Sequence, residues 1–148
     1  MKTVFDKEIR ESLINRINLL NDKSRAQLGK MNVYQMLRHC ALSEELYLGK
    51  TTYKRRLVGR LLGGKALRNI LKDERPLGRN AKTLSVFLVK ETGGNIAEAK
   101  MKWISLIKEY EFFSKPEIVH WFFGKMNKEQ VGSFAYKHID HHLRQFNC

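Results

Sequence analysis

The chain has 148 residues, 43% of them hydrophobic, with 28 lysines and arginines against 15 aspartates and glutamates, a formal net charge of +13. This length fits a single domain, residues 1–148, with its own hydrophobic core. No run approaches the ~20 uncharged apolar residues of a membrane span, and early charges argue against a signal peptide. Only Cys40 and Cys148 are cysteines, so we expect no disulfide framework and a cytoplasmic location.

Two helices are predicted in the first third of the chain. Asp6 can cap a helix over residues 6–20, where apolar residues recur at helical spacing. Asn32, with Gln35 three residues later, resembles a capping box and would open a second helix over residues 32–48.

Residues 50–79 are strongly basic. They contain ten lysines and arginines against Asp73 and Glu74, and so carry eight of the thirteen net charges. Apolar pairs recur at helical spacing but are interrupted by Gly63 and Gly64, which predicts a short, broken amphipathic helix. Its apolar stripe fits packing against the rest of the protein at least as well as contact with an anionic membrane.

Two further helices are predicted in the second half. Asn95 can cap a helix over residues 95–113, and Asn127 can begin a last helix over residues 127–146. Residues 120–124 are interpreted as an aromatic loop between them. Long capped helices with few prolines and no strong alternation predict an all-α helical bundle.

Histidines concentrate in the last helix. On a helical wheel His138 and His142 lie in the middle of the apolar stripe, whereas Asp140 lies opposite and should face solvent. Neutral imidazoles four residues apart can share one metal ion. His39, in the second helix, is the candidate third ligand, and three imidazoles would leave positions open for water or substrate. The competing interpretation is that all three are core histidines hydrogen-bonded to backbone or side-chain acceptors.

Other polar residues near this cluster have two interpretations each. Gln145 is either a hydrogen-bond partner of a ligand or a polar residue at the helix end. His141 flanks the stripe and fits a partly exposed structural residue better than an orienting group. His120 fits packing of the aromatic loop, and Cys40 fits a small core residue better than a ligand or nucleophile.

Several stretches resemble the DinB-like superfamily. Residues 138–145, HIDHHLRQ, resemble its closing motif: a histidine, a His-His pair three and four residues later, then a glutamine. Residues 37–39 resemble its other ligand position. Residues 32–40 and 122–126 resemble, more narrowly, a branch of unknown function. The chain departs from many relatives at Leu143-Arg144, where they carry Arg-Gly.

This resemblance implies a four-helix bundle, up-down-down-up, with a long crossover and an extra short helical segment. It also implies a divalent metal ion bound by a histidine triad of His39, His138 and His142. Nickel or zinc is expected, with iron or manganese as alternatives, because three imidazoles suit several of these ions.

The resemblance further implies a metal-dependent enzyme, because characterised relatives include thiol-dependent transferases and hydrolases. The substrate would be a small molecule, anionic or a thiol, and no residue is marked as catalytic. The alternative is a non-enzymatic module that binds nucleic acid or another anionic surface through residues 50–79. Nucleic acid is not expected, since no zinc-finger or helix-turn-helix pattern is present. A homodimer is compatible with this size, although no motif specifies its face.

Overall fold

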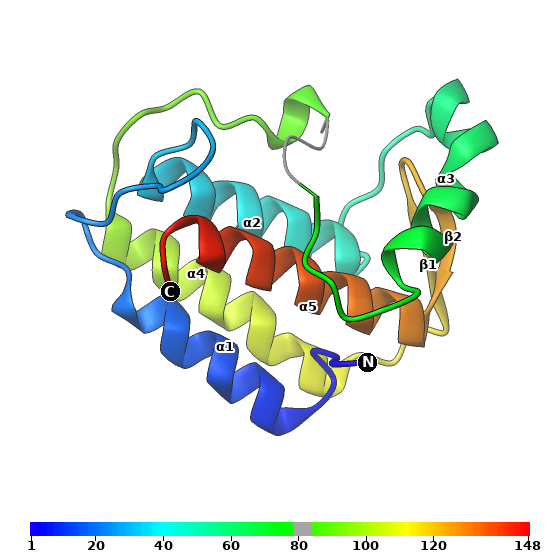
Figure 1. Ribbon diagram of the computed structural model, residues 1–148, viewed down its shortest axis with the longest axis horizontal. Helices are drawn as coiled ribbons and strands as arrows, with labels where there is room; N and C mark the ends of the chain where they lie inside the picture. Colours follow the sequence, from blue (N-terminus) through cyan, green and yellow to red (C-terminus); the bar gives the residue numbers. More distant parts are fainter. Residues whose placement is uncertain (79–83) are drawn as a thin grey trace.

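The computed structural model describes residues 1–78 and 84–148 (Figure 1); Arg79, the last residue of the basic segment, lies outside them. These residues form five α-helices, two 3₁₀ helices and one two-stranded antiparallel sheet. The prediction of an all-α four-helix bundle is therefore wrong, because a β-hairpin is built into the fold. The elements are α1 (Lys7–Leu19), α2 (Val33–Tyr47), α3 (Leu57–Ile70), η1 (Ser85–Phe87), α4 (Ile96–Lys108), η2 (Glu109–Phe112), β1 (Glu117–His120), β2 (Gly124–Asn127) and α5 (Lys128–Gln145).

Four of the helices pack around the main core. Helices α1 and α2 each contact both α4 and α5. Helices α2 and α4 run in one direction and α1 and α5 in the other (Figure 1). The parallel pair is joined at its start, where Asn32 Nδ2 donates to the Thr92 carbonyl, and near its end, where the Tyr110 hydroxyl donates to Glu44. Fully buried side chains between these helices include Leu13, Ile17, Met36, Leu37, Trp103, Leu106, Ile107, Ile139 and Leu143.

Side-chain caps begin all four of these helices, as the sequence predicts. Asp6, Asn32, Asn95 and Asn127 each accept a hydrogen bond from a backbone N–H two or three residues later. Asn32 and Asn127 form complete capping boxes with a glutamine. Each such cap stabilises a helix by about 1 kcal/mol, so the starting points of α2 and α5 are set locally.

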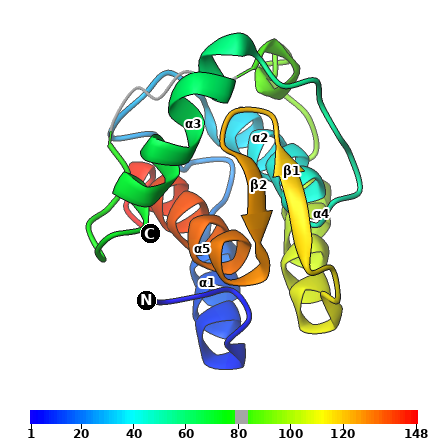
Figure 2. The same cartoon turned by 90° about the vertical axis from the view of Figure 1, so that its right-hand side faces the viewer.

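The hairpin occupies the region interpreted from sequence as an aromatic loop. Strands β1 and β2 pair with Ile118 opposite Met126, and both of these side chains are buried. Gly124 has φ +84°, a conformation that favours glycine, directly after the turn. Each strand has four residues, which is too few to show a clear alternation of apolar and polar residues in the sequence, so the hairpin is evident only from its tertiary contacts. The hairpin packs against α2, α3 and α5 (Figure 2).

Helix α3 is a single uninterrupted helix, although glycines were expected to break it. Gly59 and Gly63 face the hairpin, and a Cβ on Gly63 would lie 1.9 Å from the Phe122 carbonyl oxygen. Glycine is therefore required for this close approach. Of its large apolar residues, only Leu67 is buried. Within residues 1–78 and 84–148, no helix is long and apolar enough to cross a membrane.

Candidate metal centre

The structure brings His39, His138 and His142 together between α2 and α5. The ring centroids of His138 and His142 are 4.6 Å apart, those of His39 and His142 4.8 Å, and those of His39 and His138 5.4 Å. One ring nitrogen from each residue lies within 4.8 Å of the others, an arrangement that could hold a metal ion. In the described part of the chain, no carboxylate or thiol belongs to this group.

Hydrogen bonds fix two of the three imidazoles. Nδ1 of His39 donates to the carbonyl oxygen of Phe87 at 2.9 Å, and Nδ1 of His142 donates to Oε1 of Gln145 at 2.9 Å. Because both oxygens can only accept, each Nδ1 carries the proton and each Nε2 keeps a free lone pair. Outer hydrogen bonds of this type orient histidine ligands in metal sites.

His138 differs from the other two. Its Nδ1 is buried and has no hydrogen-bond partner among the described residues. A buried polar atom without a partner costs about 1–3 kcal/mol, so a purely structural histidine would be expected to have one. This nitrogen therefore fits a site that takes a further ligand better than it fits a satisfied core histidine.

Burial keeps the three imidazoles neutral. It lowers the pKa of His142 to about 3 and that of His138 well below 6.5, with the neighbouring histidines adding to both effects. Burial also lowers the pKa of His39, although its bond to the Phe87 carbonyl opposes the shift. The neutral imidazole is the form that binds metals, so these ligands need not lose protons at neutral pH.

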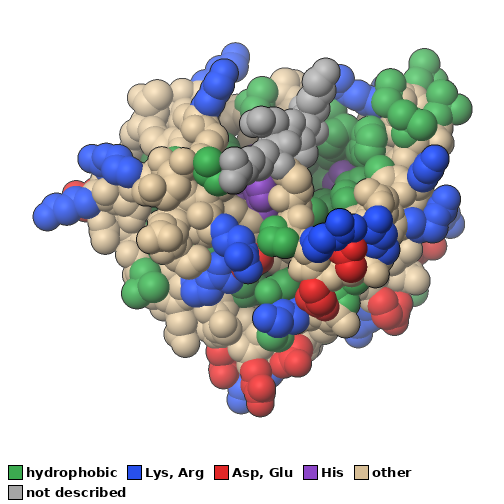
Figure 3. Space-filling view, in the orientation of Figure 1, with side chains coloured by type: hydrophobic (Ala, Val, Ile, Leu, Met, Phe, Trp, Pro, Cys, Tyr) green, Lys and Arg blue, Asp and Glu red, His purple; other side chains and the backbone are tan. Residues whose placement is uncertain are grey.

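Aromatic side chains hold the ligand rings. Tyr47 packs edge-on against His138 with centroids 5.5 Å apart, and Phe134 stacks on the same ring at 6.2 Å. Phe87 packs edge-on against His39. His138 is the one partly exposed member of the triad. Figure 3 shows histidine side chains beside hydrophobic side chains on one face of the molecule.

The remaining residues singled out from sequence lie near the triad or apart from it. Gln145 is a direct partner of His142, and its Nε2 lies 3.4 Å from Nε2 of His141. His120 is buried in the hairpin, where its Nδ1 accepts from the backbone N–H groups of residues 122 and 123. Cys40 is buried in the core. The packing interpretations of His120 and Cys40 are thus confirmed.

The prediction that Asp140 faces solvent is wrong. Its carboxylate is buried and bonds Nη1 of Arg16 at 2.8 Å and Nε of Arg144 at 2.6 Å. The neighbouring buried residue Lys137, which no sequence pattern marks, donates from Nζ to three carbonyl oxygens at the end of α3 and just after it. Helix α5 is therefore covered on the side opposite its ligands as well.

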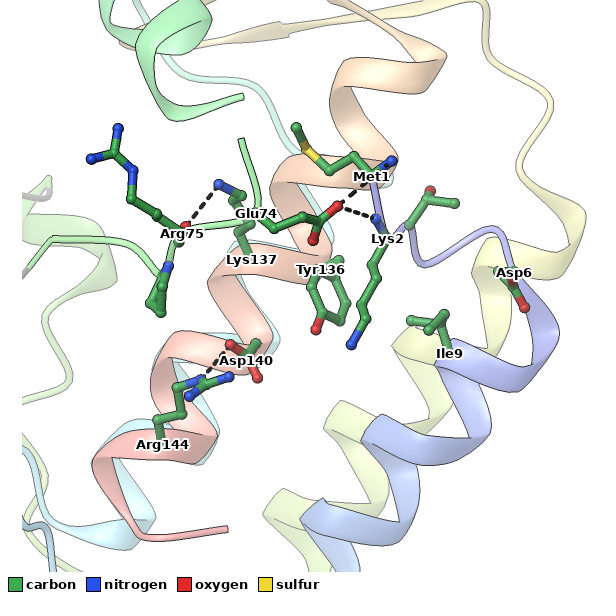
Figure 4. A pocket seen from close by; sticks show the side chains of 12 residues that line it. Met1, Lys2, Asp6, Ile9, Glu74, Arg75, Tyr136, Lys137, Asp140 and Arg144 are labelled. Atoms are coloured by element: carbon green, nitrogen blue, oxygen red, sulfur yellow. Dashed lines mark hydrogen bonds and ion pairs between the residues drawn. The ribbon is translucent and has the colours of Figure 1, made fainter. Parts of the chain in front are cut away.

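A hollow lies on that opposite side of α5 (Figure 4). Its lining includes Lys137, Asp140 and Arg144 but none of the triad. Its charges are largely paired with one another, since Glu74 pairs with the N-terminal ammonium group of Met1 and Asp140 pairs with Arg144. This surface therefore fits a structural contact between the N-terminus, residues 74–76 and α5.

Comparison with known proteins connects this chain to one family. A family model described as a protein of unknown function, DUF1569, matches residues 6–148. No curated protein and no solved structure matches the chain.

Proposed function

The chain belongs to the DUF1569 family of proteins of unknown function, and we propose that it holds a divalent metal ion with His39, His138 and His142 and uses it in catalysis. The observation that carries this proposal is the convergence of three neutral imidazoles, one of which has a buried nitrogen without a partner among residues 1–78 and 84–148. We also infer that the chain is DinB-like. The histidine motif in residues 138–145 and the position of His39 on α2 support that inference.

The proposed reaction class is a thiol-dependent transfer or a hydrolysis. Three histidine ligands leave coordination positions open, and a divalent ion there supplies Lewis-acid chemistry that polarises a substrate or lowers the pKa of a thiol or water. Nickel or zinc suits the imidazole set, with iron or manganese as alternatives. The chain itself contributes orientation: the Phe87 carbonyl and Gln145 hold two ligand rings in place.

The proposed substrate is a small molecule, either anionic or a thiol. The net charge of +13 would attract an anion toward the protein over several ångströms. The aromatic groups around the triad, Tyr47, Phe87 and Phe134, would exclude water from the ligand rings.

Elemental analysis of untagged protein tests the metal proposal. Wild type should contain about one divalent ion per chain, and His138→Ala should lose it. His141→Ala is the matched control, because its ring is next to the triad in sequence but outside the group of three, and it should keep the ion. Absence of metal from wild type, even after incubation with nickel, zinc, iron and manganese salts, would make the three histidines core residues.

The enzyme part is tested separately on the metal-loaded protein. Thiol-transfer and hydrolysis assays should show turnover in wild type that His138→Ala abolishes. A loaded wild type without turnover in either class of assay would remove the reaction assignment and leave the metal site standing.

A further inference from the structure

Helix α3 exposes its largest side chains. Leu57 and Leu61 are 75% and 84% exposed, and Val58 and Leu62 are 59% and 55% exposed. These four residues, called here the α3 apolar row, occupy the first two turns of the helix. Single exposed leucines are common on proteins, but four on adjacent turns of one helix form a patch that calls for an explanation.

The row is held in this orientation by the opposite side of the helix. Gly59 and Gly63 lie against the backbone of the hairpin, with a Cβ on either coming within 3.0 Å of Phe122 backbone atoms. No larger residue fits there, so α3 cannot rotate to bury the α3 apolar row. The end of the helix is anchored too, because Lys137 Nζ donates to the Ile70 carbonyl at 2.7 Å and to the Asp73 carbonyl at 2.6 Å.

Positive charge surrounds the row. Residues 50–72 contain eight lysines and arginines and no acidic residue. Among the described residues, Lys50 is the one cation of this stretch in an ion pair, with Glu109. Figure 3 shows lysine and arginine side chains beside the hydrophobic ones in the region of α3. The exposed cations next to the row are Lys54, Arg56, Arg60, Lys65 and Arg68.

We propose that α3 docks on the surface of an anionic lipid membrane. The α3 apolar row would enter the boundary between headgroups and acyl chains, while the flanking lysines and arginines contact lipid phosphates, as interfacial amphipathic helices do. Each basic group near such a surface strengthens binding.

Two other partners fit this face less well. Nucleic acid would use the cations but would leave four large aliphatic side chains against phosphates, where they gain nothing. A second copy of the chain would bury the row, but a two-fold contact would place the same cations of both chains side by side. A membrane is the partner that uses both the apolar row and the charges.

Vesicle flotation of the full chain tests the proposal. Wild type should float with phosphatidylcholine vesicles that contain about one third phosphatidylglycerol, and not with pure phosphatidylcholine. Leu57→Gln/Leu61→Gln should lower partitioning at least about tenfold, because two leucines leave the apolar phase. Phe112→Gln is the matched control, since Phe112 is 80% exposed but lies on η2, and it should float like wild type. Arg60→Gln/Lys65→Gln/Arg68→Gln should also lose binding.

The outcomes separate this proposal from its rivals. Absence of flotation at low salt overturns it, as does a double leucine variant that floats like wild type, which would indicate attraction by charge alone. A wild-type dimer that becomes monomeric in the double variant, without flotation, would assign the row to a second copy. Tighter binding to RNA or DNA than to vesicles, lost in the arginine and lysine variant, would assign it to nucleic acid. Matching thermal melts confirm that the variants fold, and His138→Ala should float normally, so this result is independent of the metal site.

Discussion

Glu44 offers a sharp test of the electrostatics inside the protein. Its side chain is completely buried on α2, where Oε2 accepts from the Tyr110 hydroxyl and Oε1 has no partner among the described residues. Burial raises the pKa of this carboxyl from 4.5 to about 8, although the Tyr110 hydroxyl opposes the shift. The folded protein therefore keeps Glu44 protonated at neutral pH, whereas the unfolded chain ionises it.

The stability that this group contributes depends on pH in a defined direction. Because the folded pKa is the higher one, the contribution is fully present below about pH 4.5 and is lost as the pH rises through about 8. Each pH unit in this window corresponds to about 1.4 kcal/mol. Wild type should therefore lose roughly 3–4 kcal/mol from Glu44 between about pH 5 and pH 8.

Glu44→Gln removes the proton but keeps the shape of the side chain. Its free energy of unfolding, measured by urea denaturation, should rise relative to wild type by roughly 3–4 kcal/mol from about pH 5 to pH 8. All other titrating groups are shared by the two proteins, so the difference between them isolates Glu44. In Tyr110→Phe, which lacks the hydroxyl that favours the carboxylate, the loss should extend above pH 8. A wild-type to Glu44→Gln difference that stays constant over this range would refute the reasoning.

Four further outcomes are expected. Gln145→Leu removes the acceptor for Nδ1 of His142 and should weaken metal affinity about 10–100-fold in a chelator competition; unchanged affinity would show that the glutamine does not orient the ligand. Burial lowers the pKa of His142 to about 3, so metal affinity should change little between about pH 7.5 and pH 6, where three ordinary imidazoles would weaken it about 50-fold. Gly63→Ala should lower the free energy of unfolding by about 2 kcal/mol or more, because its Cβ would overlap the hairpin backbone. Gly64→Ala, where the nearest atom to the new Cβ is 3.7 Å away, should raise the free energy of unfolding by up to about 1 kcal/mol. Equal thermal melts for the two variants would contradict the packing of α3. Lys137→Met leaves three carbonyl groups without their donor and should lower the free energy of unfolding in urea by about 3 kcal/mol. A variant with the same urea midpoint as wild type would show that water replaces the ammonium group.

The helix starts could be predicted because they depend on neighbouring residues. Asn32 with Gln35 and Asn127 with Gln130 form their capping boxes within four positions of the chain, so no distant contact is needed. The hairpin could not be predicted in the same way. Its inward residues, such as Ile118 and Met126, are buried, and the hairpin contacts α2 and α3, which are distant in the sequence. A four-residue strand has too little pattern of its own.

The metal-ligand candidates on α5 were predictable for a related reason. His138 and His142 are one turn apart, so a helix alone places them on one face. The partners that hold them could be foreseen only in part: Gln145 lies on the same helix, but the Phe87 carbonyl reaches His39 from another segment of the chain. The prediction for Asp140 was wrong because it treats the helix face opposite the apolar stripe as exposed to solvent. Arg16 of α1 covers that side and turns a surface position into a buried ion pair.

The orientation of α3 depends on the structural role of its glycines. In the sequence, Gly63 and Gly64 look like a break in an amphipathic helix, and the leucines then look like its packing face. In the structure, Gly59 and Gly63 are the packing face, because the hairpin backbone approaches too closely for any side chain. A helix face made of glycine carries no large side chains, so the four residues of the α3 apolar row lie away from it and are exposed to solvent, whereas Leu67 is buried. The exposed row and the buried glycines are thus one feature, and replacing either glycine would disturb the presentation of the leucines without touching them.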